Sequence, residues 1–503
     1  MTPPPFVATF LLAGCPSTPA PPEGPSDALD TASETTAPSD TAMDTLPPSD
    51  TAPETPPSGD AVVSTRTDLA PWLGFDITLD ATPTARLACD SVSDPRERHA
   101  RNVESGFHSL PGLLAGHRYA CRLEARGAVL WEALAETPPL PQGLPDLVVS
   151  QTGHAELQDG WLVFNQWGDG DIHRALIVDG DGQIRWHRAL DAARGGVTVT
   201  WDGTYLVAGG RDLPPSQFDL DGTQLYRGTE LDGEFVYYHH ESRRVVLEGV
   251  PAILALTSTE LPPELRTHEP AQLGFQIEVH DPATDTILWQ YDVADHMEDW
   301  GVPDDIADPW HTNAVTWEPD GHLWISARGT NTLTRIEQAT GTPTHVLGAQ
   351  GTVQLLDRDG QALPLSAWFS GQHGPHQAGD RLFLLDNGRP SRGSSRAVEY
   401  RLDLEAHEAT EVWSWTEPGW VEPYYGNVEP LPGGHILVAS GHCLQCEGSG
   451  GADRSAFVVE VDPTTNDVRW RLDLVTAGTS LFRAQYVAPC DLFHHVGRCP
   501  EAE

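Results

Sequence analysis

Beyond residue 145, the chain repeats one arrangement of apolar and polar positions. A short turn leads into an apolar strand, as in DGWLVFNQ at 159–166, and two further strands then flank an acidic or Gly turn, as in FVVEVDPTTNDVRWRLD at 457–473. Six copies of the first strand begin at residues 159, 202, 251, 320, 379 and 433, with steps of 43, 49, 69, 59 and 54 residues. Each step accommodates one four-stranded propeller blade of about 40–50 residues plus insertions. The repeat therefore predicts an all-β fold with a six-bladed β-propeller over 145–490, in preference to a non-repeating array of β-sandwiches.

A smaller set of strands precedes this repeat. Residues 72–79 read WLGFDITL, which alternates in the way expected of a half-buried strand. Residues 110–125 read LPGLLAGHRYACRLEA and resemble the late strands of a fibronectin type III domain. We therefore expect a small β-sandwich domain over 61–144 with a structural role.

The N-terminal part of the chain has no pattern of a folded domain. Residues 16–60 hold eleven prolines and nine carboxylates, so this segment is expected to be a disordered linker. Before it, LLAGC at 11–15 resembles the lipobox of bacterial lipoproteins, although the segment lacks the basic residues that usually begin a signal peptide. This resemblance predicts a signal segment at 1–15, lipidation of Cys15 and a lipid-anchored protein of the bacterial cell envelope, on the periplasmic or outer-membrane face.

Charge and composition exclude several functions. The 503-residue chain carries a formal charge of −43, which disfavours a nucleic-acid partner because a phosphate backbone would be repelled. All thirty basic residues are arginine, so chemistry that needs a Schiff-base or phosphate-loop lysine is excluded. No apolar run approaches the roughly 20 residues of a transmembrane helix. The expected membrane contact is therefore through a lipid anchor alone.

Three histidines occur at similar positions in successive repeats. His240, His311 and His373 precede the first strands of their copies by eleven, nine and six residues. In a propeller these positions lie near the start of the innermost strand, so the three imidazoles are expected to converge on the central channel. Arg328 ends the strand LWISAR and is expected to face the same channel.

These residues also carry a family resemblance. The segments that carry it are Tyr238-His239-His240-Glu241, Pro309 to Val315, Gly321 to Arg328, Gly371-Gln372-His373, Asp386-Asn387-Gly388 and Arg396 to Tyr400. Together they resemble the bacterial arylsulfotransferases, a family of six-bladed propellers, with decreasing clarity from about 145 to 490. The resemblance implies transfer of a sulfuryl group from an aryl sulfate to a phenolic acceptor, with no nucleotide donor (PAPS) and no cofactor.

The resemblance also implies roles for individual residues. His373 matches the histidine that becomes sulfated, and Arg328 matches the arginine that binds the sulfate. His311 and His240 match two supporting catalytic histidines, and Asn313 matches a substrate-binding asparagine. Two histidine pairs leave the inward residue open at this stage, because His239 is adjacent to His240 and His376 follows His373 by three positions. Glu241 stands where the family pattern has Asp.

The residue types suit this chemistry on their own grounds. An imidazole titrates near pH ~6.5, so a neutral ring is available as a nucleophile towards sulfur. The guanidinium of arginine donates paired hydrogen bonds to a tetrahedral oxyanion and keeps its charge. A second histidine, His311 or His240, can protonate the departing phenolate and later deprotonate the incoming phenol.

Other interpretations use the same residues. The histidines could line the throat of a non-catalytic binding propeller, or three of them could bind a metal in a hydrolase or lyase, although a metal enzyme would not need Arg328. We expect no metal. The strand-ending tryptophans are expected to fill the core, namely Trp186, Trp289, Trp413 and Trp470. The remaining histidines at 154, 322, 345, 435 and 442 are expected to be incidental.

Six of the seven cysteines remain once Cys15 is set aside. An even number agrees with up to three disulfides in an oxidising compartment. Cys89 and Cys121 could link two strands of the sandwich, and Cys490 with Cys499 would hold the C-terminal tail at 491–503. Cys443-x-x-Cys446 could also be a redox pair or half a zinc site, but the family's own loop disulfide favours a Cys443–Cys446 bond.

Overall fold

A computed structural model describes residues 58–492, apart from 69–70, 81–83, 169–171, 191–196, 200–203, 208–213, 233–235, 269–270, 302–305, 319, 350, 389–391, 445–454 and 477. The predicted signal segment with Cys15, most of the predicted linker, Cys446 and Cys499 lie outside the described residues. The first described strand begins at Ser58, three residues before the predicted start of the N-terminal domain.

Two antiparallel sheets form the N-terminal part, from 58 to 136. One is ordered β1-β2-β5 and the other β4-β3-β6-β7. Their inner faces share a core that includes Leu73, Phe75 and Tyr119, each fully buried. Cys89 and Cys121 lie opposite each other in neighbouring strands and are joined by a disulfide. The strands are β1 (Ser58–Thr65), β2 (Trp72–Asp80), β3 (Ala85–Ser91), β4 (Arg98–Val103), β5 (Gly106–Pro111), β6 (Arg118–Ala125) and β7 (Ala128–Glu136).

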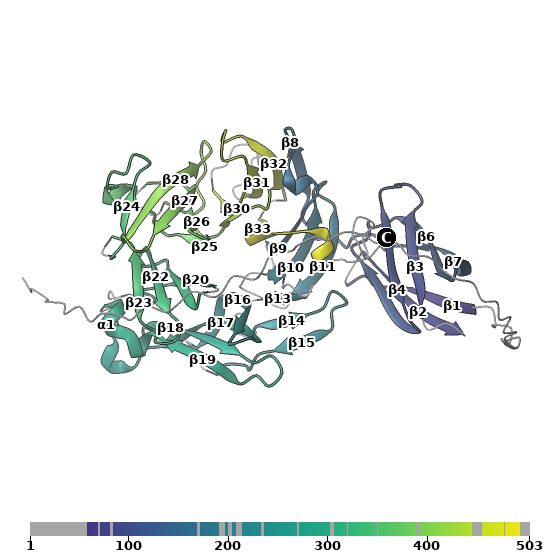
Figure 1. Cartoon of the computed structure of the whole chain (residues 1–503), viewed down its shortest axis with the longest axis horizontal. Coiled ribbons are helices and arrows are strands. Elements are labelled where there is room, and N and C mark those ends of the chain that lie inside the picture. Colours follow the sequence, from purple (N-terminus) through teal and green to yellow (C-terminus); the bar gives the residue numbers. More distant parts are fainter. Residues whose placement is uncertain are drawn as a thin grey trace, which may run out of the picture. The chain divides into compact units, whose positions relative to one another are not determined.

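The prediction of an all-β protein is confirmed: within the described residues, the chain from 147 to 487 forms six further sheets. Figure 1 shows them following one another around a common centre, a propeller-like arrangement. Written from the inside outwards, the first three are β33 (Ser480–Val487), β9 (Trp161–Gly168), β10 (Ile172–Asp179), β11 (Ile184–Leu190); β12 (Val197–Val199), β13 (Tyr205–Val207), β14 (Ser216–Phe218), β15 (Gln224–Arg227); and β16 (Tyr237–Leu247), β17 (Val250–Glu260), β18 (Leu273–His280), β19 (Ile287–Asp292).

The other three sheets continue the same order. They are β20 (Thr312–Trp317), β21 (His322–Ala327), β22 (Thr332–Glu337), β23 (Pro343–Leu347); β25 (His373–Ala378), β26 (Arg381–Asp386), β27 (Arg396–Asp403), β28 (Glu408–Trp415), with β24 (Gln354–Leu356) parallel to β28; and β29 (Asn427–Pro430), β30 (Ile436–Cys443), β31 (Ser455–Val461), β32 (Val468–Leu474), β8 (Leu147–Gln151). The apolar strand of each sequence repeat is the second strand of its sheet. The short helices include a 3-10 turn η1 (Glu156–Gln158), α1 (Met297–Trp300) and α2 (Pro489–Leu492).

Strands from the two ends of this region complete two of the sheets. The C-terminal strand β33 pairs antiparallel with β9, and β8 pairs antiparallel with β32. The ends of the region are thereby hydrogen-bonded into sheets formed by distant parts of the sequence. This arrangement places β33 on the inside of the ring, next to β12 and β29 in space.

Apolar side chains fill the space between neighbouring sheets. One core cluster joins Phe164 and Leu176 of the first sheet to Leu437 and Trp470 of the last. The strand-ending tryptophans are part of such clusters as predicted: Trp186, Trp413 and Trp470 are buried, and Trp289 packs against a fourth core. Inner strands therefore present mainly polar residues to the centre, because their sheets bury apolar residues against each other.

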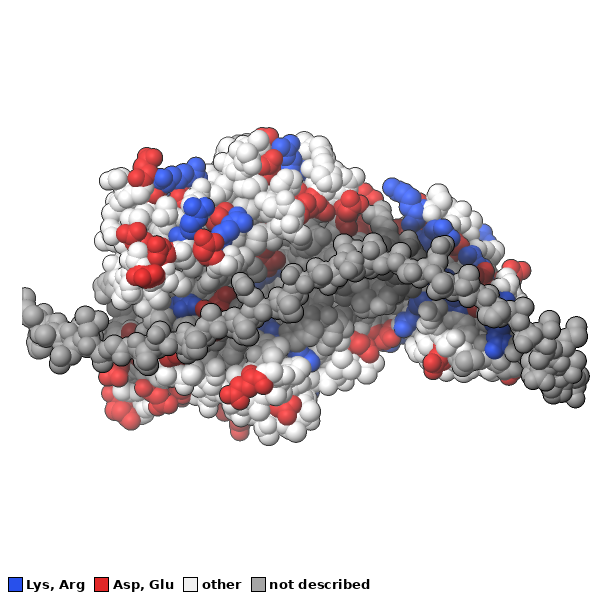
Figure 2. All heavy atoms as spheres, viewed as in Figure 1, with Lys and Arg blue, Asp and Glu red and all other residues white. Residues whose placement is uncertain are grey.

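The exterior is acidic, in keeping with the net charge of −43. On the face shown in Figure 2, acidic side chains are scattered with arginines between them. None of the helices in the described residues has the length and hydropathy of a membrane span.

Candidate active site

The side chain of His373 is held rigidly at the start of β25. Its Nδ1 lies 3.0 Å from the carbonyl oxygen of Gly371 and 2.9 Å from Oδ1 of Asn387. The Asn387 amide nitrogen in turn donates to the carbonyl oxygens of Glu422 and Tyr425, which fixes the orientation of the amide. Since both partners of Nδ1 are acceptors, Nδ1 carries the hydrogen and the lone pair of the ring lies on Nε2.

The loop before His373 is tied to the neighbouring sheet. The side-chain nitrogen of Gln372, Nε2, lies 3.1 Å from Oγ of Ser326. It also lies within hydrogen-bond distance of the backbone carbonyl oxygens of Ala327 and Thr332. Gln372 is fully buried. Because Arg328 follows Ala327 directly, these bonds connect the end of β21, with Arg328, to the loop of His373.

Asn313 also supports this loop from β20. Its side-chain nitrogen donates a hydrogen bond of 2.8 Å to the backbone carbonyl oxygen of Gln372. The backbone carbonyl oxygen of Asn313 accepts a hydrogen bond of 2.8 Å from the guanidinium of Arg483. The Oδ1 atom of Asn313 is buried and has no hydrogen-bond partner among the described residues. The described residues therefore leave this buried acceptor unsatisfied.

Gly374 follows His373 in a conformation suited to glycine. Its φ is +51°, and a Cβ placed there would lie 2.5 Å from Cβ of Asn427 and 2.9 Å from its Cα. No other residue type fits at 374 without moving β29 or the His373 backbone.

His240 and His311 lie side by side, as their positions in the repeat predict. Their ring centroids are 5.4 Å apart with an interplanar angle of 73°. Both residues have positive φ, 58° for His240 and 42° for His311, which turns their side chains away from regular strand geometry. The Nδ1 atoms of His239 and His240 share a short hydrogen bond, so the two imidazoles of this pair contact each other directly.

Two arginines act on this histidine cluster. The guanidinium of Arg328 donates to the carbonyl oxygen of Pro423 over 3.3 Å. Arg483, from β33, forms an ion pair of 2.7 Å with buried Glu241. The pKa of His373 is held well below its ordinary value by burial and then by the positive charge of Arg328, with a smaller effect of Arg483. Both cations therefore act electrostatically on His373.

Burial keeps the inner histidines neutral. It lowers the pKa of His240 well below the ordinary value, with the charges of His239, His311 and His373 adding to the effect. It lowers the pKa of His239 to about 4. At neutral pH, the lone pair on Nε2 of His373 is therefore available to a nucleophilic step.

An aromatic wall borders the cluster. We use this name for Trp167, Tyr425 and Phe482, which contact one another at ring-centroid distances of 4.9 to 5.9 Å. Phe482 also lies 5.6 Å from the ring of His240, centroid to centroid. Phe482 is fully buried, whereas Trp167 and Tyr425 are partly exposed and can pack against an aryl ring through stacked or edge-to-face contacts.

His376 points to a different place from His373. The register of β25 with β26 shifts between the two residues. His376 borders a cavity of about 250 Å³ that is lined by Arg243 and Glu429 and also by His240 and Arg483 of the histidine cluster. Burial lowers the pKa of His376 to about 4.

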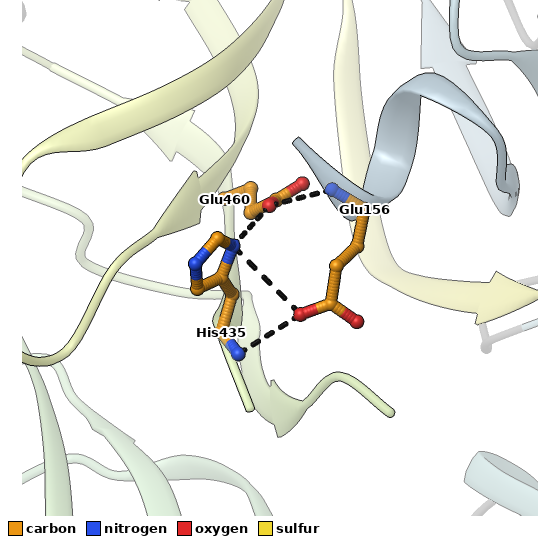
Figure 3. Close-up of side chains that lie close together, drawn as sticks. All are labelled: Glu156, His435 and Glu460. Carbon is orange, nitrogen blue, oxygen red and sulfur yellow. Dashed lines mark hydrogen bonds and ion pairs between the residues drawn. The ribbon is translucent and has the colours of Figure 1, made fainter. Parts of the chain in front are cut away.

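A separate cluster has ligand types that could hold a metal. Glu156, His435 and Glu460 bring three ligand atoms within 4.8 Å of one another (Figure 3). Their atoms are engaged with the protein, since Glu460 accepts hydrogen bonds from the backbone of Glu156 and Leu157, and Glu156 accepts from the backbone of Gly433 and His435. We interpret the cluster as structural, because its hydrogen bonds connect η1 to β31 and to the turn before β30. In the part of the chain that the structure describes, His240, His311 and His373 do not form such a cluster.

The remaining cysteines agree with an oxidised protein. Cys443 and Cys490 are each disulfide-bonded. The predicted partners, Cys446 and Cys499, lie outside the described residues, so these two pairings stay predictions.

The sequence motifs led to His240, His311, Arg328, Asn313 and His373, but other members of the site were missed. Arg483, Phe482, Trp167 and Tyr425 lie in strands and loops without a recognisable motif. Asn387 lies within the Asp-Asn-Gly segment that carried the family resemblance, which was the available signal for it.

Comparison with known families decides the identity. The family model "Arylsulfotransferase (ASST)" matches residues 148–483, most of the chain and all of the histidine cluster. The chain belongs to the arylsulfotransferase family. This arylsulfotransferase is therefore a transferase, and membership of the family implies aryl sulfates as its substrates.

The comparisons with individual proteins are more distant. No curated protein matches this arylsulfotransferase at a significant level. Among solved structures, a protein of unknown function from Bacteroides caccae is 13% identical with a TM-score of 0.43, and the match covers 65% of this chain and 99% of that one. A catalytically inactive virginiamycin B lyase from Staphylococcus aureus, in complex with quinupristin, is 11% identical with a TM-score of 0.31, covering 65% and 100%. Similarities this low carry no information about the reaction.

Proposed function

We propose that the protein transfers a sulfuryl group from an aryl sulfate to a phenol, without PAPS or any other cofactor, through a sulfo-histidine at His373. The observation that carries the proposal is the anchoring of His373 Nδ1 by two acceptors, Gly371 O and Asn387 Oδ1. This anchoring leaves a neutral Nε2 aimed away from its support, in a buried site with cations nearby. Such a nucleophile divides one difficult transfer into two easier steps.

Cations at the site stabilise the sulfuryl oxygens. Arg328 is proposed to bind them with its guanidinium fork, and Asn313 to bind the substrate beside it. Arg483 adds positive charge, although Glu241 compensates for part of it. The acidic exterior does not oppose an anionic donor strongly, because at physiological salt its field decays over about 8 Å.

The aromatic wall gives the site its preference for aryl groups. Trp167 of β9 and Phe482 of β33 belong to one sheet, Tyr425 comes from the loop before β29, and Phe482 lies against His240. An aryl ring packed there would place its sulfate towards the histidine cluster. Donor and acceptor rings are proposed to use this surface in turn, as a two-step transfer requires.

The wider organisation supports a secreted, tethered enzyme. We assign the six sheets from 147 to 487 as the six blades of a propeller, and the two N-terminal sheets as a β-sandwich domain. The proposed lipidation of Cys15, followed by an acidic Pro-rich linker, would hold the enzyme at a membrane of the bacterial envelope, on the periplasmic or outer-membrane face. Metabolic labelling with a fatty acid, compared between the intact chain and Cys15→Ala, tests this assignment.

A two-substrate assay tests the reaction itself. With 4-nitrophenyl sulfate as donor, we expect release of 4-nitrophenol that rises with the concentration of an added phenol and yields the sulfated acceptor. Prior treatment with EDTA should leave the rate unchanged, because no step uses a metal. Loss of activity on chelation would instead support a metal hydrolase or lyase. Absence of turnover with any aryl sulfate would leave a non-catalytic binding propeller.

Replacement of Gly374 tests whether the position of His373 matters. In Gly374→Ala the new Cβ collides with Asn427, so β29 or the backbone of His373 must move, and a displacement of His373 by about 1 Å can cost about 100-fold in rate. We expect a loss of kcat of about this size in the two-substrate assay.

Gly379→Ala is a matched control for this variant. Gly379 also has a positive φ, +64°, but a Cβ there meets no atom within 4 Å. The control should keep the wild-type kcat. Equal losses in both variants would show that backbone strain, and not the displacement of His373, lowers the rate.

A further inference from the structure

Asp308 contacts His311 through both of its carboxylate oxygens. Oδ2 lies 2.7 Å from Nδ1 of the ring, and Oδ1 accepts a hydrogen bond of 3.0 Å from the backbone nitrogen of His311. Neither residue belongs to the body of a strand, and both side chains are partly exposed, 36% for His311 and 38% for Asp308. The pair therefore lies at the solvent-accessible side of the histidine cluster.

The turn that holds this pair is rigid. Between the two residues, Trp310 is 2% exposed and belongs to a hydrophobic core cluster. Its carbonyl oxygen accepts a hydrogen bond of 2.7 Å from the backbone of Gly329, the residue after Arg328. The positive φ of His311, 42°, turns the ring back over Asp308. The carboxylate and the ring are thus fixed relative to each other and to Arg328.

The other histidines of the cluster have different partners. His373 donates to two neutral oxygens, and His240 shares a hydrogen bond with the imidazole of His239. Within the described residues, His311 is the one member of these four with a carboxylate partner. The hydrogen bond from His311 keeps the pKa of Asp308 below its ordinary value in spite of burial, so the carboxylate is ionised at neutral pH. An ionised carboxylate stabilises a protonated imidazole.

We infer that Asp308 is a positioning residue that holds His311 as the proton carrier of the transfer, in place of His240. Asp308 fixes the hydrogen on Nδ1 and stabilises the imidazolium, which directs Nε2 of His311 towards the reacting oxygen. The inference rests on the proposed function. It assigns the proton transfer to His311, whereas the pattern of histidines in the sequence leaves this step open between His311 and His240.

The two half-reactions then balance. In the first, the lone pair on Nε2 of His373 forms the N–S bond while the S–O bond of the donor breaks, and the departing phenolate oxygen takes the proton from Nε2 of His311. In the second, the acceptor phenol gives its proton to His311 while its oxygen forms a new S–O bond, and the electron pair of the N–S bond returns to His373. His311 starts and ends protonated, and no proton is exchanged with water overall.

The dependence of the rate on the leaving group tests the inference. A poor leaving group such as the phenolate of phenyl sulfate needs a proton donor, whereas 4-nitrophenolate leaves readily without one. In Asp308→Asn we expect phenol release from phenyl sulfate to fall about 100-fold, and release from 4-nitrophenyl sulfate to fall less than about 10-fold. Single-turnover measurements of the first half-reaction give both numbers.

Asp320→Asn is the matched control. Asp320 accepts from Nδ1 and the backbone of His322 in a similar local pair, but on an exposed turn outside the cluster. It should retain the wild-type rates with both donors. His311→Ala and His240→Ala provide an independent measurement that leaves Asp308 in place. The larger loss with phenyl sulfate should occur in His311→Ala.

Three results would overturn the assignment: equal losses with both donors in Asp308→Asn, wild-type rates in that variant, or a leaving-group effect confined to His240→Ala. If Asp308→Asn does not fold, the two histidine variants decide alone. A wild-type enzyme without turnover on either donor would contradict the proposed function itself, which is a distinguishable outcome.

Discussion

Replacing His373 with alanine is expected to lower the rate of sulfuryl transfer by at least about 1000-fold, because loss of a covalent nucleophile removes both half-reactions together. The ring is anchored on Nδ1 by Gly371 and Asn387, and among the described residues the neighbouring ring of His240 instead shares a hydrogen bond with His239. Rapid mixing of wild-type enzyme with a radiolabelled aryl sulfate in the absence of acceptor should trap one label per chain. His373→Ala should trap none.

His376→Ala is the appropriate comparison, since it removes the same ring from the same strand. His376 lies beyond the register shift in β25 and borders the cavity that His240 and Arg483 also line, so the comparison shows which of the two rings of β25 takes the label. We expect labelling of this variant to match the wild type. Labelling that is lost in His376→Ala and kept in His373→Ala would show that the nucleophile has been assigned to the wrong histidine.

Removing the guanidinium of Arg328 is expected to have the second largest effect. One preorganised donor to a developing oxyanion contributes about 2.7–4 kcal/mol, so kcat/KM of Arg328→Ala should fall about 100- to 1000-fold. Arg328→Lys keeps the charge without the paired hydrogen bonds and should recover part of the loss. Initial rates over a range of donor concentrations measure both variants.

The loss in Arg328→Ala must be separated from a general effect of removing an arginine. Arg401 is an exposed arginine at 3.9 Å from Asp380, on the sheet of His373 but towards its outer part. Arg401→Ala should keep wild-type kinetics. A loss of less than about tenfold in Arg328→Ala would argue against direct contact between this arginine and the transferred group.

Much of the fold was accessible from the sequence because the repeat has a physical basis. The second strand of each sheet is covered on both faces by neighbouring sheets, so it contains a run of buried apolar residues, as from Leu382 to Leu385 in β26. The innermost strands face a polar centre and lack this signature. For that reason the pattern did not reveal that β33 pairs with β9, nor that β8 adds to β32.

The same contrast applies to the site. His240, His311 and His373 could be found because their distance from the apolar strand recurs, and the segments around them match a family. Arg483 and Phe482 come from the last inner strand, where no spacing links them to the histidines. Asp308 was within reach of local reasoning, since an Asp three residues before a His in a tight turn can contact its ring. The role assigned to Asp308 depends on which other histidines of the cluster lack a carboxylate partner, and only the three-dimensional structure shows this.

The closing strand has a consequence for when the enzyme becomes active. Strand β33 contributes Phe482 to the aromatic wall and Arg483 to the hydrogen bond with Asn313, and it also pairs with β9 from the other end of the region. Since β33 is the innermost strand of the sheet that contains β9, this sheet stays incomplete until the last strand of the region has been synthesised. A chain that ends before Ser480 would lack this strand together with two side chains of the proposed substrate site, so the proposed transfer would require the finished chain.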